Sequence, residues 1–153
     1  MKIEGEYNFD APRQEVWNTV RDPDELMKAL PGTQSFKQVS DSEYEGSINL
    51  RVGPVNGTFA GKLTVSDENP PESCTLTVEG KGAAGFIKGV GHVVLTEQGE
   101  NKTLFKYTGE LSIGGKLAGI GQRLMDSVGK SILSKGLETL NKNLVAKLAT
   151  KTP

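Results

Sequence analysis

Residues 43–65 read EYEGSINLRVGPVNGTFAGKLTV, and two alternating patterns in this stretch decide the fold class. On either side of Gly53-Pro54, apolar residues and glycines occupy every second position, with polar residues between them. Alternation with a period of two predicts strands that have one buried and one solvated face. The stretch therefore predicts two neighbouring antiparallel strands joined by a turn at Gly53-Pro54.

The same alternation continues on both sides of this stretch. Residues 34–113 contain six such runs separated by turn residues, and residues 2–9 (KIEGEYNF) form a seventh. Between the first and second runs lie two short segments, in which Pro12 and Pro23 stand where a first helical turn accepts proline. The sequence therefore predicts one strand, two short helices and then six antiparallel strands.

After residue 113 the pattern becomes helical. Apolar residues recur every three or four positions, at Leu117, Ile120, Leu124, Val128, Ile132 or Leu133, Leu137, Leu140, Leu144 and Leu148. This spacing predicts one helix of about 30 residues whose apolar side covers the dry face of the sheet. We therefore expect an α+β fold with a curved seven-stranded antiparallel sheet, as one domain over residues 1–148 with a short tail over residues 149–153.

Six glycines share the phase of the apolar residues in their strands and should therefore lie on the inner face of the sheet. They are Gly46, Gly57, Gly61, Gly89, Gly91 and Gly109. A glycine inside a strand costs about 0.5–1 kcal/mol and has no side chain to pack. Either these glycines let the terminal helix approach and the strands bend, or they keep a cavity open for an apolar ligand. The sequence leaves both explanations open.

Several kinds of active site lack the residues or the context that they need. Residues 80–85 (GKGAAG) match the G-x-G-x-x-G fingerprint of dinucleotide-binding proteins, but the residues that follow alternate like a strand, where the fingerprint needs a helix. The single cysteine, Cys74, and the single histidine, His92, form neither an intramolecular disulfide nor a zinc site. We therefore expect no catalytic residues, no metal and no covalently bound cofactor.

Basic residues concentrate at the C-terminal end of the chain. Residues 114–153 carry seven basic and two acidic residues, a net charge of +5, whereas residues 1–113 carry −6. The basic segment is either a solvated helix face that complements an acidic body or a surface that docks on anionic lipid or an acidic partner. It contains no aromatic residue to stack on bases, so nucleic acid is not an expected partner. The candidate membrane or partner surface consists of Lys116, Arg123, Lys130, Lys135 and Lys142.

The expected location is the cytoplasm. No apolar run approaches the roughly 20 residues that a membrane-spanning helix needs. The first ten residues, MKIEGEYNFD, carry charges where a signal peptide is apolar. If the basic surface docks on lipid, we expect peripheral contact at the inner face of the membrane.

Three segments carry the most specific similarity to a known family. They read V-G-P-V-x-G-x-F-x-G over residues 52–61, G-x-G-x-x-G-F over residues 80–86 and G-G-K-L-A over residues 114–118. With the segments around them, they resemble the family of the G subunit of carbon monoxide dehydrogenase, within the START-like, polyketide-cyclase-like SRPBCC superfamily. The resemblance covers nearly the whole chain. It implies a helix-grip fold, in which the sheet wraps around the long terminal helix and forms a hydrophobic pocket with it.

The resemblance also implies a function. Members of the family accompany molybdenum-containing carbon monoxide dehydrogenase and related oxidoreductases, and they are thought to recruit the enzyme to the membrane or to carry a quinone. This implies a non-catalytic accessory protein that binds a quinone, a fatty acid or another apolar molecule and whose partner is a molybdenum hydroxylase-type enzyme. Two alternatives are an assembly or maturation factor that acts by protein contact and a small cyclase- or hydrolase-type enzyme.

The inner-face phase of the strands and of the helix predicts which residues form the wall of the pocket. Each of them has plain core packing as the alternative role. The predicted wall consists of Ile48, Leu50, Phe59, Leu63, Leu76, Val78, Gly89, Gly91, Val93, Phe105, Tyr107, Leu117, Ile120, Leu124 and Val128.

Overall fold

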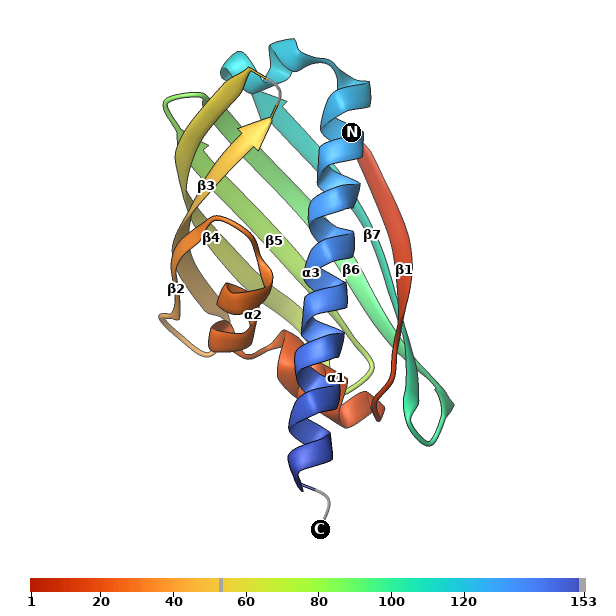
Figure 1. Ribbon diagram of the computed structural model, residues 1–153. Coiled ribbons are helices and arrows are strands. Elements are labelled where there is room, and N and C mark those ends of the chain that lie inside the picture. Colours follow the sequence, from red (N-terminus) through yellow and green to blue (C-terminus); the bar gives the residue numbers. More distant parts are fainter. Residues whose placement is uncertain (53, 152–153) are drawn as a thin grey trace.

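The computed structural model describes residues 1–52 and 54–151 as one antiparallel sheet with the helices on one of its faces (Figure 1). The elements are β1 (Lys2–Phe9), α1 (Arg13–Val20), α2 (Pro23–Ala29), β2 (Thr33–Gln38), β3 (Glu43–Val52), β4 (Val55–Asn69), β5 (Ser73–Gly82), β6 (Gly85–Gly99), β7 (Lys102–Gly114), the 3-10 helix η1 (Gly115–Ile120) and α3 (Gln122–Lys151). Gly53, in the predicted turn between β3 and β4, lies outside the described residues.

The seven strands lie in the order β1-β7-β6-β5-β4-β3-β2, and every neighbouring pair is antiparallel. The α+β class, the seven-stranded sheet and the two short helices between the first two strands are therefore confirmed. The fingerprint-like segment GKGAAG forms the end of β5, a tight turn and the start of β6. A strand follows it, as predicted, and no helix N-terminus is present there to hold a pyrophosphate.

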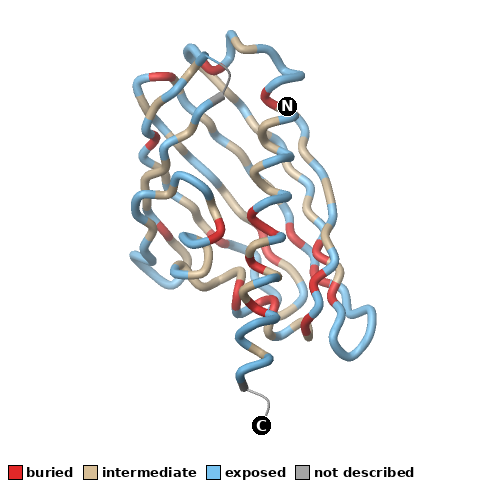
Figure 2. Tube along the Cα trace, viewed as in Figure 1, coloured by how far each residue is buried: buried red, intermediate tan, exposed pale blue. Residues whose placement is uncertain are grey.

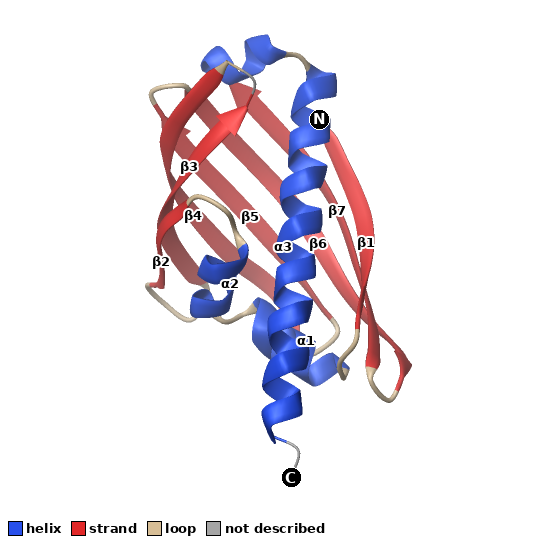
Figure 3. Ribbon diagram, viewed as in Figure 1, coloured by secondary structure: helices blue, strands red, loops and turns tan. Residues whose placement is uncertain are grey.

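Local sequence explains where α2 begins. Asp22 precedes the helix, and its side chain accepts a hydrogen bond of 3.0 Å from the backbone N–H of Asp24. Pro23 occupies the first helical position, where its missing N–H costs nothing. The helix lies over the edge of the sheet that carries β2 and β3 (Figure 3).

The terminal helix differs from the prediction at its start. Leu117 and Ile120 belong to η1. Gly121, with a φ of 102°, then breaks the helical conformation before α3 begins at Gln122. The expectation of one continuous helix from Leu117 is therefore wrong. At its other end α3 continues to Lys151, so the helix includes residues assigned above to a tail.

The buried side chains gather at one end of the molecule, around α1 and the C-terminal half of α3 (Figure 2). This main cluster contains, among others, Phe9, Trp17, Leu95, Leu140 and Leu144, none more than 7% exposed. A smaller cluster at the other end consists of Phe59, Ala84, Leu117 and Met125. Between the two clusters the inner face of the sheet is only partly covered, and this is where the cavity lies.

Candidate functional site

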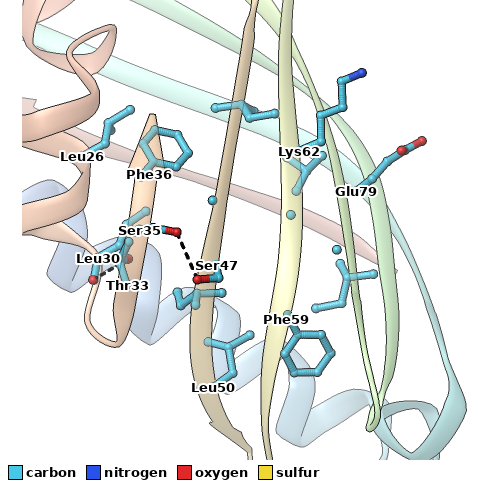
Figure 4. A pocket seen from close by; sticks show the side chains of 17 residues that line it. Leu26, Leu30, Thr33, Ser35, Phe36, Ser47, Leu50, Phe59, Lys62 and Glu79 are labelled. Atoms are coloured by element: carbon cyan, nitrogen blue, oxygen red, sulfur yellow. Dashed lines mark hydrogen bonds between the residues drawn. The ribbon is translucent and has the colours of Figure 1, made fainter. Parts of the chain in front are cut away.

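A cavity of about 310 Å³ lies between the inner face of β2–β5 and helix α2. Leu26 of α2 and Leu30, the residue after α2, lie on one side of it, and Leu50 and Phe59 lie on the sheet (Figure 4). Ile48, Leu63 and Val78 of the sheet also line it. Val78 faces the inner side, yet it is 40% exposed, because the cavity leaves it uncovered. This volume is at the lower end of what small-molecule sites occupy, about 300–1,000 Å³.

A row of three glycines forms the floor of the cavity. Gly46 of β3 pairs with Gly61 of β4, and Gly61 pairs with Gly80 of β5. All three line the cavity. Because no side chain rises from this row, bare backbone takes the place of three core residues.

The space around each glycine shows why it is there. A Cβ on Gly46 would collide with the carbonyl oxygen of Ser35, so this position needs glycine for the close approach of β2. A Cβ on Gly80 would meet no atom closer than the carbonyl oxygen of Ala60 at 4.0 Å, an ordinary contact. Local packing therefore requires glycine at Gly46, whereas at Gly80 it leaves room for a larger residue.

Three of the other inner glycines do not open the cavity. The side chain of Leu111 fills the space above Gly89, where a Cβ would collide with it. Gly91 and Gly109 pair with each other across β6 and β7 and pack backbone against backbone. Close packing therefore explains glycine at these three positions, and the cavity lies over the glycine row; an apolar ligand in the cavity stays a prediction.

The predicted wall is divided between the cavity and the core. Five of its residues, namely Ile48, Leu50, Phe59, Leu63 and Val78, line the cavity. Val93 and Phe105 belong to the main cluster, and Leu76 and Tyr107 pack against it. Leu117 belongs to the smaller cluster, and Ile120 and Val128 pack against it. Leu124 is 39% exposed and lies outside both clusters. The ligand-binding role of all these residues stays a prediction.

Among the apolar residues and glycines that line the cavity, sequence reasoning missed five. They are Leu26, Leu30, Phe36, Gly80 and Ile87. Ile87 and Gly80 have the inner-face phase and pair with each other, so their phase was a usable signal. The sequence contains no such signal for Leu26, Leu30 and Phe36. Their place at the cavity depends on how α2 and the residues after it pack on distant elements: Leu30 Cδ2, for example, lies where it would be 3.4 Å from a Cβ on Gly136 of α3.

A polar network fixes one end of the cavity. The ring of Phe36 stacks on that of Tyr44, with 5.4 Å between centroids and 17° between planes. The hydroxyl of Tyr44 donates to the carbonyl oxygen of Arg21 at 2.8 Å, and Arg21 Nε lies 2.8 Å from Glu68 Oε1. Burial raises the pKa of Tyr44, although the nearby Arg21 acts in the opposite direction. This tyrosine therefore stays neutral and anchors Phe36 against the cavity.

The polar residues at the cavity have partners of their own or point away from it, and the hydroxyl of Thr33 donates to the carbonyl oxygen of Leu30 at 2.8 Å. Lys62 and Glu79 alternate with inner-face residues and point to the outer face of the sheet (Figure 4). Ser35 and Ser47 lie next to each other with their hydroxyl oxygens 3.1 Å apart. Among the described residues that line the cavity, no titratable side chain points into it. The arrangement can bury an apolar molecule and offers no acid or base to it.

Cys74 is buried, and burial together with the charge of Glu68 raises its pKa to about 11. A protonated thiol is a poor nucleophile, so we expect iodoacetamide at about pH 8 to label the folded chain about ten-fold more slowly than the chain in urea. Equally fast labelling of folded and unfolded chain would contradict this and make Cys74 a candidate nucleophile.

Since the folded pKa of Cys74 lies above the ordinary 9.0, the stability of the folded chain should fall as the pH rises from about 9 to about 11.

The remaining predicted features lie on the surface. His92 is exposed on the outer face, as its phase predicts, and its Nδ1 lies 3.0 Å from the hydroxyl of Thr75. The five basic residues of the candidate surface are all exposed, on η1 and α3. Of these, Lys130 is paired with Asp126 at 3.2 Å. Their role in docking stays a prediction.

The family model for the G subunit of carbon monoxide dehydrogenase (CoxG) matches residues 5–145. The chain belongs to the CoxG family. A solved structure of a conserved protein from Geobacillus kaustophilus is 28% identical to this CoxG-family chain, with a TM-score of 0.91 over 95% of this chain and 96% of that one. None of the curated proteins compared with the chain matches it in sequence.

More distant structures share the fold of this CoxG-family protein. An aromatase/cyclase from Streptomyces sp. R1128 has a TM-score of 0.72 at 11% identity, over 97% of this chain and 95% of that one. A START superfamily protein from Mycobacterium smegmatis has a TM-score of 0.71 at 10% identity, over 95% and 97%. At such identities the likeness shows the START-like fold alone. In the described part of the chain, no helix is long and apolar enough to cross a bilayer.

Proposed function

We propose that this CoxG-family protein binds an apolar small molecule, namely a quinone, a fatty acid or a similar lipid, in the cavity above the glycine row. The observation that carries the proposal is Gly80, because local packing leaves room there for a larger residue and yet the position is bare. A glycine in the middle of a strand costs about 0.5–1 kcal/mol, and a bound ligand that needs the space gives that cost a reason. Burial of the ligand supplies about 0.8 kcal/mol per methylene before ordering costs.

We further propose that the protein is a non-catalytic accessory of a molybdenum-containing carbon monoxide dehydrogenase-type oxidoreductase, which it serves by membrane recruitment or quinone delivery. Membership of the CoxG family supports this partner. The wall of the cavity favours carriage over catalysis, because general acid–base chemistry needs a titratable group within reach of the reacting atom. An assembly factor remains the alternative, and it would bind the oxidoreductase equally well with an empty cavity.

The identity of the ligand is tested on protein purified without detergent. Native mass spectrometry should show a mass above that of the bare chain, and an organic extract of the denatured protein should contain the matching quinone or lipid. The absence of any apolar molecule, together with no uptake from quinone-containing vesicles, would contradict ligand carriage. A pull-down of the oxidoreductase that is unchanged by emptying the cavity would favour the assembly factor.

Membrane docking is tested by reversing charges on α3. We expect Lys135→Glu with Lys142→Glu to weaken sedimentation with phosphatidylserine-containing vesicles by about ten-fold or more, since each lysine near an anionic surface contributes about 1 kcal/mol. Lys81→Glu with Lys88→Glu, on the outer face of the sheet, is the matched control with the same change in net charge. Equal losses from both pairs would show an effect of net charge alone and would contradict docking through α3.

A further inference from the structure

A second, smaller cavity lies beyond the Gly80 end of the glycine row. It has a volume of about 220 Å³ and lies between Met1, Leu111 and Ile113 on the sheet side and Ala118, Gln122 and Met125 on the helix side. Its lining is partly polar, because Gln122 contributes to it and the amino group of Met1 donates to the carbonyl oxygen of Leu111 at 2.8 Å. It adjoins the break between η1 and α3, because Gly121 also lines it. None of the sequence patterns pointed to this cavity.

The two cavities lie along one continuous row of the sheet. From the glycine floor the row continues with Gly80 paired to Ile87 on β6, and Ile87 paired to Ile113 on β7. Ile87 lines the main cavity and Ile113 lines the second one. Paired residues of neighbouring antiparallel strands have their Cα atoms only about 4.5–5.5 Å apart. The two hollows are therefore next to each other on the same inner face.

A small group of side chains separates them. Phe59 lines the main cavity and packs in one cluster with Leu117 and Met125, and these three are 2%, 1% and 8% exposed. Met125 also lines the second cavity. Methionine is flexible and adapts to irregular space, so it can make way for a ligand at low cost.

The segment that carries this partition packs on the sheet through Leu117, which is 1% exposed. η1 lies between Gly115, with a φ of 73°, and Gly121, with a φ of 102°. Its Leu117 N–H donates a 3.1 Å hydrogen bond to the carbonyl oxygen of Ala84. Two glycines in a conformation that other residues rarely adopt mark the ends of a segment that can pivot.

We propose that the two cavities form one channel for a linear acyl or isoprenoid tail, and that Leu117 and Met125 set the length of tail that binds without rearrangement. The inference rests on the proposed apolar ligand. A short tail fits in the main cavity. A longer tail passes Phe59, displaces Leu117 and Met125, and ends in the second cavity between Ile113 and Ala118.

Methionine methyl NMR tests this on the full chain with two probes, decanoate and hexadecanoate, each below its critical micelle concentration. The chain has three methionines, of which Met27 is exposed on α2 next to Leu26, a residue that lines the main cavity, and Met1 and Met125 line the second one. Both acids should shift the methyl signal of Met27, and only hexadecanoate should shift the methyl signal of Met125. A Met125 signal that responds alike to both acids, or to neither while Met27 responds, would overturn the proposal.

A variant that fills the second cavity tests it by affinity. Ala118→Phe should lower the affinity for hexadecanoate by about ten-fold or more and change the affinity for decanoate by less than about two-fold. Keeping two methylenes out of an apolar site is enough for such a loss. Gly119→Phe is the matched control, since a side chain at that position meets open space. Equal effects of Ala118→Phe on both acids would overturn the channel, whereas failure of both acids to bind the unaltered chain would overturn the proposed function as well.

Discussion

Replacing Gly80 by leucine is expected to weaken the binding of apolar ligands strongly while the protein stays folded. The new side chain rises from the floor into the cavity, where a Cβ meets nothing closer than 4.0 Å. We expect a loss of affinity for decanoate of at least about 30-fold, because the leucine takes up the space of several ligand methylenes. Gly80→Ala and Gly80→Val should give graded, smaller losses, measured by calorimetry or by displacement of a fluorescent probe.

The control for this series lies on the same strand. Thr77 of β5 belongs to the outer face, so Thr77→Leu adds a similar side chain without entering the cavity. Thr77→Leu should leave affinity unchanged, and Gly80→Leu should unfold at the same temperature as the unaltered chain or a higher one, because it removes a strand glycine. Full ligand affinity in folded Gly80→Leu would mean that the ligand binds elsewhere.

Truncation of a core leucine is expected to cost far more stability than truncation of a leucine at the cavity. Leu95 is 1% exposed in the main cluster, so Leu95→Ala leaves a new void and should cost about 2–5 kcal/mol. This corresponds to a fall in melting temperature of about 5–15 °C for a domain of this size. Leu50 already faces empty space, so Leu50→Ala should cost less than about half as much. Thermal and urea unfolding of the ligand-free chain measure both changes.

The comparison of the two leucines also tests the position of the cavity. If Leu50→Ala is as destabilising as Leu95→Ala, the space above Leu50 is filled in solution and the cavity is closed. If the cavity is open, decanoate should stabilise Leu95→Ala more than Leu50→Ala and so narrow the difference between them, because Leu50→Ala loses a contact with the ligand. Leu95→Ala should keep the affinity of the unaltered chain under conditions where it is folded.

Periodicity was sufficient to predict the sheet and most of its inner face. Ile48, Leu50 and Phe59 alternate with polar residues, and the structure places all three at the cavity. Periodicity did not distinguish the cavity from the core, because Val93 and Val78 share the same inner face. Val93 is 5% exposed in the main cluster and Val78 is 40% exposed. The difference comes from which helix lies above each residue.

The helix break was hidden by a coincidence of spacing. Leu117, Ile120 and Leu124 are three and four residues apart, so η1 and α3 read as one helix. The positive φ of Gly121 ends that continuity, and a run of glycines around η1 was the available signal. The place of α2 over the sheet could not be predicted, since α2 packs against β2 and α3, and contacts between elements far apart in sequence leave no local pattern.

The most direct test of the central claim is where an apolar molecule binds. Stearic acid with a nitroxide on its chain broadens the NMR signals of nearby amides in the ¹⁵N-labelled protein. We predict the strongest broadening at Gly61, Gly80 and Ile87, on the floor of the cavity, and little at Gly99 and Lys102, at the distant turn between β6 and β7. Broadening centred on that turn, or spread evenly over the chain, would contradict the claim that this cavity is the binding site.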